Sequence, residues 1–415
     1  MTYSDLPAPR SPRYRSLDMW RGTACLMIVL IHAANGLDLE QLRSNAQTHW
    51  ASSLVALLLS RLGVGVTIFF VISGYCISAT ADSNRRSGAG CGQYFVRRIR
   101  RIFPPYWVLL AVCLASVCAA AALGGLSIFT DGSCRIPAPG SLSLPQWLGN
   151  LTLTEAWRYH LSDDANARLL LFGPAWSLCY EEQFYLVCGL LLFLAPRRFF
   201  GGIALVTLFT VAVAGLSFPK TSASLQYFFF DGRWLLFALG VLVYYIVNYA
   251  EGRRRNALVV AMALCVVATA ALRYGLLPRM GDDEQRQRMF EYLVAAGFAF
   301  SLLLLHRWDG RITASRLLAP LHFCGKICYS LYLIHWPVTI LITHGLHSAG
   351  VRGVWPTFLV VVPLATSASV VAGWLFYRFV ERHFINQPVG RAPRETTAQP
   401  AAPAPSVAGV ILSEV

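Results

Sequence analysis

Ten apolar stretches divide the chain, and each has about the length that an α-helix needs to cross a bilayer, about 20 residues. They cover residues 17–36, 53–79, 104–124, 174–195, 203–218, 232–249, 257–275, 290–305, 321–345 and 355–379. Only 13% of the 415 residues are charged, against about 25% in an average soluble domain. The sequence therefore predicts an all-α polytopic membrane protein. It excludes a soluble enzyme, a disordered chain and a secreted disulfide scaffold.

Basic residues are distributed unevenly between the two sides that these stretches define. With the N-terminus inside, most of the Lys and Arg residues fall in inside segments, among them the runs at 97–101 and 253–255. Cytoplasmic loops of membrane proteins carry such an excess. It also accounts for the net charge of +14 without a nucleic-acid partner. We predict about ten transmembrane helices with both termini in the cytoplasm.

The chain is predicted to consist of three segments. Residues 1–16 form a cytoplasmic N-terminal segment, 17–385 the transmembrane domain, and 386–415, rich in Pro and Ala, a disordered cytoplasmic tail. The first apolar stretch lacks a clear cleavage site and nine more follow, so we interpret it as a retained helix. The 11 cysteines lie mostly inside apolar stretches and lack zinc spacing, so we expect no metal site.

Polar residues interrupt the apolar stretches at four places, and a charged or titratable group at membrane depth is costly enough to suggest a function. In the first stretch, Arg21 and His32 lie about 16 Å apart along a helix and about 20° apart around it. One face therefore presents a cation at the inner mouth and an imidazole deep inside. The alternative is an interfacial anchor at Arg21 and a hydrogen bond from His32 to a neighbouring helix.

A run of arginines precedes the third stretch on the cytoplasmic side. It contains Arg97, Arg98, Arg100 and Arg101. Guanidinium groups bind phosphates through paired hydrogen bonds, and residues three apart share a face of a helix. Arg98 and Arg101 could therefore form an anion site, and the alternative is simple anchoring at the membrane surface.

Two adjacent carboxylates, Glu181 and Glu182, lie one and a half to two turns inside a helix that can start at Pro174. Neighbouring side chains on a helix diverge by about 100°, so at least one of them is expected to face the protein interior. Paired acids at this depth are rarely without a role.

The ninth stretch contains Tyr329, Tyr332 and His335, spaced by three and therefore aligned on one face of a helix. His335 is expected at a depth similar to that of His32, and Pro337 is expected to kink the helix there. The alternative role for this face is hydrogen bonding between helices.

These groups are expected to converge. The first and ninth stretches run outward and the fourth runs inward. His32, His335 and the Glu181/Glu182 pair could then meet at one level in the outer half of the membrane, with the arginines at the inner mouth. The prediction is an anion site below an acid/base site.

Five motifs, in order from the first stretch to the ninth, resemble those of the acyltransferase-3 family of integral-membrane acyltransferases. They are Arg21 followed after ten residues by His32; Gly65-Val-Thr-Ile-Phe-Phe-Val-Ile-Ser-Gly74; Arg98-Ile-Arg-Arg101 before Ile-Phe-Pro-Pro-Tyr; Trp176-Ser-Leu-Cys-Tyr-Glu-Glu-Gln-Phe-Tyr185; and Tyr329-Ser-Leu-Tyr-Leu-Ile-His-Trp-Pro337.

The resemblance implies transfer of an acyl group from cytoplasmic acyl-CoA, usually acetyl-CoA, to a hydroxyl of a sugar or glycoconjugate, with no permanently bound cofactor. It also implies a place in the bacterial cytoplasmic membrane, among membrane lipid. His32 would be the general base or a transient acyl carrier, because an alcohol needs a positioned base at neutral pH. The implied site has His32, Glu181 and Glu182 as catalytic residues; Arg21, Arg98 and Arg101 as residues that bind acyl-CoA; and Ser177, Tyr329, Tyr332 and His335 as substrate or structural support.

Two alternatives to an acyltransferase remain. The first is a proton-coupled transporter or flippase of an anionic substrate, which a basic mouth and buried His and Glu residues would also suit; the second is a non-catalytic scaffold. Many members of the family carry a C-terminal esterase-like domain, for which this chain is too short. We therefore expect either direct transfer to the acceptor or delivery to a separate acyl-accepting protein.

Overall fold

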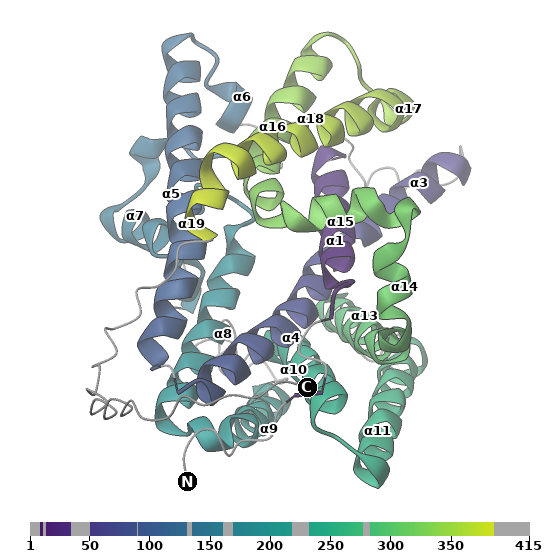
Figure 1. Ribbon diagram of the computed structural model, residues 1–415. Coiled ribbons are helices and arrows are strands. Elements are labelled where there is room, and N and C mark those ends of the chain that lie inside the picture. The colour runs from purple at the N-terminus through teal and green to yellow at the C-terminus, as the bar shows by residue number, and fades with distance from the viewer. Residues whose placement is uncertain are drawn as a thin grey trace, which may run out of the picture.

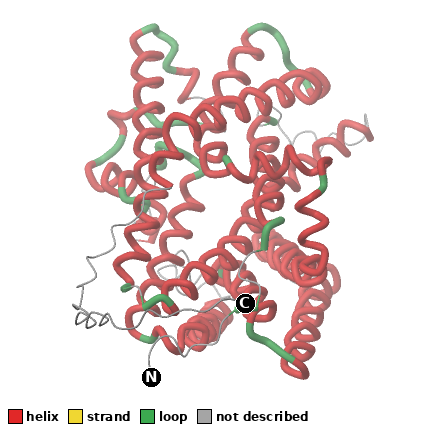
Figure 2. The backbone as a smooth tube through the Cα atoms, in the orientation of Figure 1, coloured by secondary structure: helices red, strands yellow, loops and turns green. Residues whose placement is uncertain are grey.

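The computed structural model describes residues 9–10, 14–34, 50–88, 90–130, 135–160, 169–217, 232–276 and 283–385. Within these ranges the chain is helical and contains no strand, as the sequence predicts (Figure 2). The expected C-terminal tail, 386–415, and most of the expected N-terminal segment lie outside the described residues.

A helix occupies each of the ten predicted stretches. Seven helical segments are long and apolar enough to cross a membrane: Trp50–Arg86, Cys91–Ala122, Ala175–Leu194, Pro196–Val213, Gly252–Leu276, Gln285–Ala314 and Val354–Ile385. An eighth span is possible where Arg316–Lys326 and Cys328–Ser348 join at a bend of 75°. The first helix, α1 (Leu17–Ala33), has 17 residues and α10 (Arg233–Asn248) has 16, so the total of ten spans and the placement of the termini stay predictions.

Helix α1 lies in the middle of the bundle, where it packs against α4 (Gly65–Arg86), α15 (Ala319–Lys326) and α16 (Cys328–Ser348) (Figure 1). The contact with α15 is made backbone to backbone. A Cβ atom added to Gly22 would lie 2.0 Å from the carbonyl oxygen of Leu321, and one added to Gly325 would lie 1.7 Å from that of Asp18. Small residues permit such close approach in membrane helices, and here they fix α15 beside the N-terminal half of α1.

The other helices surround this centre. They are α3 (Trp50–Arg61), α5 (Cys91–Ala122), α6 (Ser127–Thr130), α7 (Leu144–Leu151), α8 (Ala175–Leu194), α9 (Phe199–Ser217), α11 (Gly252–Ala271), α13 (Asp283–Leu305), α14 (Asp309–Ala314), α17 (Val354–Pro356), α18 (Val362–Phe376) and α19 (Arg382–Ile385). Helices α5 and α8 lie on one side of the central group, and α11, α13 and α14 lie on the other (Figure 1).

The third predicted stretch is longer than expected, because α5 begins at Cys91 and not near residue 104. The arginine run therefore lies inside the helix, with Pro104 and Pro105 also inside it. Proline is tolerated within membrane helices when neighbouring groups satisfy the freed backbone. As a result Arg98 and Arg101 do share a helical face, as their spacing predicts.

The ninth stretch is broken at Ile327, which separates α15 from α16 and lies ten residues before Pro337. Helix α16 continues through Pro337 to Ser348. The bend turns α16 relative to α15, so the depth of His335 does not follow from a straight helix that starts near Gly325.

Candidate functional site

The two histidines predicted to lie at the same depth contact each other directly. Nδ1 of His32, in the last turn of α1, lies 2.9 Å from Nε2 of His335 on α16. On its other side, Nδ1 of His335 lies 2.6 Å from the carbonyl oxygen of Tyr332. A chain of hydrogen bonds therefore connects the two rings to the backbone of α16.

The groups at each end of this series of hydrogen bonds determine which ring nitrogens carry a proton. A carbonyl oxygen only accepts, so Nδ1 of His335 carries the hydrogen, and in a neutral imidazole the second nitrogen is then an acceptor. Nε2 of His335 accepts from Nδ1–H of His32. Nε2 of His32 is left with a lone pair and no proton, which is the state that a general base or a nucleophile requires.

Aromatic side chains hold the pair in place. The two imidazole rings stack with centroids 5.1 Å apart, and Trp336 meets the His32 ring edge-on at 4.9 Å. His335 is completely buried, whereas His32 is partly exposed. Trp336 in turn packs on Gly173, where an added Cβ would lie 2.7 Å from its ring. The orientation of His32 is thus set by packing as well as by its hydrogen bond.

A second region, which we call the arginine cavity, lies beside the pair and has a volume of about 360 Å³. It collects side chains from α1, α4, α5, α8, α15, α16 and the end of the transmembrane domain. Seven of the predicted site residues line it: Arg21, Arg98, Arg101, Ser177, Glu181, Tyr329 and Tyr332. The structure thus brings most of the candidate site to one cavity.

The three arginines of the cavity differ in their contacts. Arg98 donates to Thr80 Oγ1 at 2.9 Å and lies over the ring of Tyr185 at 4.8 Å. Arg21 pairs with Asp18 at 3.0 Å and contacts the sulfur of Cys76 at 2.9 Å. Arg101 makes no hydrogen bond or ion pair within the described parts of the chain. Its donors are free for a ligand.

Of the two adjacent carboxylates, Glu181 lines the arginine cavity and Glu182 does not. Glu181 Oε1 accepts hydrogen bonds from Ser73, at 2.7 Å, and from the hydroxyl of Tyr185. The expected meeting of a carboxylate with the histidines is not found within the described structure, where His335 and not a glutamate bonds Nδ1 of His32. The reason is position along α8, because Glu181 lies about 6 Å, one turn, beyond Ser177.

Tyr332 connects the two regions. Its ring lines the arginine cavity, its hydroxyl donates to the carbonyl oxygen of Pro174 and lies 3.0 Å from Ser177 Oγ, and its own carbonyl oxygen accepts from His335. Neither His32 nor His335 lines this cavity. Tyr329 lies at the other end of the same helical face, where its hydroxyl donates to the carbonyl oxygen of Ile102 at 2.7 Å.

Sequence reasoning did not single out Glu381 or Lys326, which also line the cavity. Glu381 is 2% exposed and accepts from the backbone N–H of Ser330 at 3.0 Å and from its hydroxyl. The available signal was an acidic residue between Arg378 and Arg382 at the inner end of the last stretch, a place where only anchoring cations are expected. Among the described residues, no three His, Cys, Asp or Glu side chains gather in a way that could hold a metal ion.

Comparisons with known proteins identify the family of this chain and several relatives. The model of the acyltransferase-3 family, described as an acyltransferase domain, matches residues 14–378. The O-acetyltransferase OatA of Staphylococcus aureus (strain NCTC 8325 / PS 47) is 25% identical over 386 residues, covering 89% of this chain and 57% of OatA. The putative membrane-bound transacylase BcsY of Komagataeibacter xylinus is 25% identical over 354 residues, covering 84% of this chain and 80% of BcsY.

The chain thus spans little more than half the length of its OatA relatives. No solved structure matches it. The family match extends over all five motifs and over the histidine pair, and it ends three residues before Glu381. The protein belongs to the acyltransferase-3 family of membrane acyltransferases.

Proposed function

We propose that this protein transfers an acyl group, most simply acetyl, from cytoplasmic acyl-CoA to a hydroxyl group of a sugar or glycoconjugate at the bacterial cytoplasmic membrane. The observation that carries the proposal is the hydrogen-bond chain from Tyr332 through His335 to His32. It leaves one lone pair, on Nε2 of His32, and Tyr332 joins this histidine pair to the cavity lined with arginines.

The chemistry follows from that lone pair. Nε2 of His32 removes the proton of the acceptor hydroxyl as the oxygen attacks the thioester carbonyl; the carbon–sulfur bond breaks, and the CoA thiolate takes up the proton. Imidazole suits this role because its ordinary pKa lies near neutrality. In a second version of the same reaction, Nε2 attacks the carbonyl first, the carbon–sulfur bond breaks and the CoA thiolate leaves; the acceptor oxygen then takes the acyl group from Nε2, and its proton goes to the thiolate.

His335 supports either version. When Nε2 of His32 gains a proton or an acyl group, its ring becomes cationic, and the bond from Nδ1–H to His335 becomes charge-assisted and stronger. His335 thus does for His32 what a carboxylate does in other catalytic chains, which is to fix the tautomer and stabilise the cation. It is a positioning residue, since it is completely buried and both of its ring nitrogens are engaged, one by His32 and one by the carbonyl oxygen of Tyr332.

The arginine cavity suits the donor. Arg21, Arg98, Arg101 and Lys326 outnumber the acids Asp18, Glu181 and Glu381 on its lining, and Arg101 has free donors. Guanidinium groups recognise phosphate oxygens through paired hydrogen bonds. Coenzyme A supplies such phosphates. The hydroxyl-rich end, at Ser177 and Tyr332, is the end in contact with the histidine pair.

The test is a comparison of glycans and metabolites by mass spectrometry between cells with and without the gene, complemented with the wild type or with His32→Ala. The expected result is an acyl increment, about 42 Da for acetyl, that the wild type restores and the variant does not. A carrier of anions would leave CoA unreleased in membranes that contain the acceptor, whereas an acyltransferase releases it. Absence of any acyl difference would overturn the proposal.

A further inference from the structure

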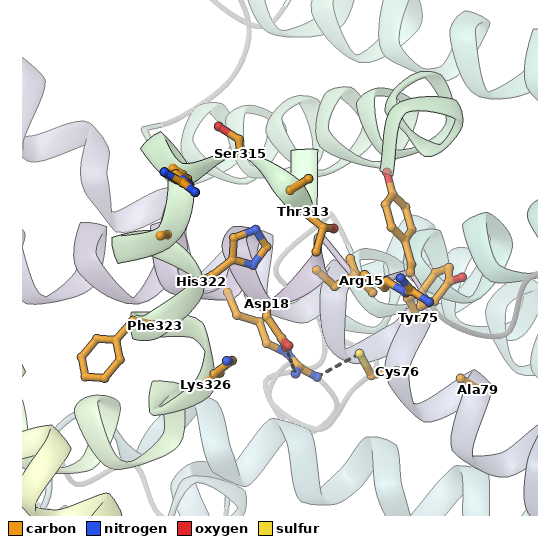
Figure 3. A pocket seen from close by; sticks show the side chains of 16 residues that line it. Arg15, Asp18, Tyr75, Cys76, Ala79, Thr313, Ser315, His322, Phe323 and Lys326 are labelled. Carbon is orange, nitrogen blue, oxygen red and sulfur yellow. Dashed lines mark hydrogen bonds and ion pairs between the residues drawn. The ribbon is translucent and has the colours of Figure 1, made fainter. Parts of the chain in front are cut away.

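A second and larger cavity, which we call the vestibule, lies beside the arginine cavity and has a volume of about 710 Å³. Asp18, Arg21, Cys76 and Lys326 line both cavities. Figure 3 shows side chains of α1, α4, α15 and the end of α14 around the vestibule. Arg21 donates to Asp18 and to the sulfur of Cys76. Arg21 and Lys326 therefore stand on the boundary between the two spaces.

The vestibule is strongly basic. Arg15, Arg21, Arg316 and Lys326 line it, together with His322, whose Nε2 is buried without a hydrogen-bond partner. The lining acid is Asp18, which already pairs with Arg21. Within the described ranges, the side chains of Arg15, Arg316 and Lys326 form no ion pair. A concave site with several uncompensated cations attracts a polyanion.

The length of acyl-CoA determines which part of the molecule lies at the vestibule. Arg21 and His32 are eleven residues apart on one helix, a rise of about 16 Å. The pantetheine arm of coenzyme A has roughly thirteen skeletal bonds between phosphorus and sulfur, which at the reach of an extended chain gives about 15 Å. A thioester that reaches Nε2 of His32 therefore has its diphosphate near Arg21, and the rest of the molecule lies beyond Arg21.

We infer that the vestibule binds the 3′-phosphorylated adenosine of acyl-CoA, with Arg15 and Arg316 facing the 3′-phosphate and Arg21, Lys326, Arg98 and Arg101 around the diphosphate. This inference rests on the proposed donor. It adds a subsite formed by the start of α1 and the segment that joins α14 to α15, which none of the five sequence motifs contains. Phe323, which is 40% exposed and lines the vestibule, offers an aromatic face to the base.

The experiment measures the affinity of the purified full chain in lipid nanodiscs for three compounds: CoA, 3′-dephospho-CoA and 4′-phosphopantetheine. The variant is the double substitution Arg15→Ala with Arg316→Ala. Both side chains are exposed, so folding is expected to survive. The matched control is Arg311→Ala, an exposed arginine of α14 that does not line the vestibule.

In the wild type and in the control we expect CoA to bind about tenfold more tightly than 3′-dephospho-CoA, because a phosphate is lost from a guanidinium site. In the double variant the two compounds should bind within twofold of each other, and the affinity for 4′-phosphopantetheine should not change. If the double variant keeps the tenfold preference, or loses affinity equally for all three compounds, the adenosine subsite is wrong while the proposed donor stands. Failure of the wild type to bind any of the three would overturn the proposed donor together with the subsite.

Discussion

The arginine cavity and the histidine pair touch through Tyr332, yet they are built in opposite ways. The cavity is lined by side chains from seven parts of the chain, and each cation makes its own contacts or none. The pair is a single series of hydrogen bonds in which the position of every proton depends on the next partner.

The difference teaches what each region can do. Independent cations add their attraction for a polyanion, so the loss of one weakens binding without disabling the site. A hydrogen-bond chain that fixes a tautomer has no spare member, so the loss of one link changes the chemistry itself. We therefore expect changes in the cavity to act mainly on KM for the donor and changes in the pair to act mainly on kcat.

The largest effect is expected for His32→Ala. Removal of the base should lower kcat at least about 100-fold while the abundance of the protein in membranes stays the same, because His32 is only partly buried. The measurement is release of CoA from acetyl-CoA in membranes that contain the acceptor. His344→Ala, at an exposed histidine of α16, is the control. Retention of acylated product by the His32 variant would remove the pair from the mechanism.

The next largest effect is expected for His335, replaced either by Leu or by Gln. Leu offers no acceptor to Nδ1–H of His32, and the loss of a hydrogen bond to a charged ring should lower kcat about 10- to 100-fold with KM for acetyl-CoA unchanged. Gln keeps an acceptor and should recover part of that loss. Equal impairment of both variants at equal abundance would show that His335 acts only by filling space.

A smaller effect, and one on KM, is expected for Arg101→Gln in the cavity. Arg101 has free donors, so its loss should raise KM for acetyl-CoA about tenfold, the size of one charge-assisted hydrogen bond, with kcat within twofold of the wild type. Arg100→Gln is the matched control, since Arg100 lies in the same run but is exposed and does not line the cavity. A fall in kcat with KM unchanged would contradict the expectation that the cavity acts on KM and the histidine pair on kcat.

Much of this arrangement could be predicted from the sequence, because hydropathy and helical spacing act over short distances. The ten helical stretches and the shared face of Arg98 and Arg101 follow from such local patterns. The sequence predicts that His32 and His335 meet at one level, but it does not give the hydrogen bond between them, which joins residues 303 positions apart. Their positions along two helices predict that the histidines lie at one level. These positions do not predict how the two rings are oriented.

Other features needed the packed structure for equally physical reasons. Pro104 and Pro105 favour a helix that starts there, but membrane helices tolerate proline inside, and α5 begins at Cys91. Glu181 and Glu182 point about 100° apart, and only the positions of Ser73 and Tyr185 decide that Glu181 faces the cavity. Glu381 could not be recognised beside the arginines of the last helix until Ser330 was placed against it.

The smallest effect is expected at the boundary between the two regions, for Ser177→Ala. Its hydroxyl lies 3.0 Å from that of Tyr332, but Tyr332 also donates to the carbonyl oxygen of Pro174, so one hydrogen bond is lost and the tyrosine keeps its place. The expected cost is about threefold in kcat/KM, shared between both constants. Ser116→Ala, at a partly exposed serine of α5 whose hydroxyl bonds to Val112 in the same helix, is the control. A loss of kcat/KM much greater than tenfold would mean that Ser177 contacts the reacting groups. Ser177 would then be part of the catalytic region together with the histidine pair.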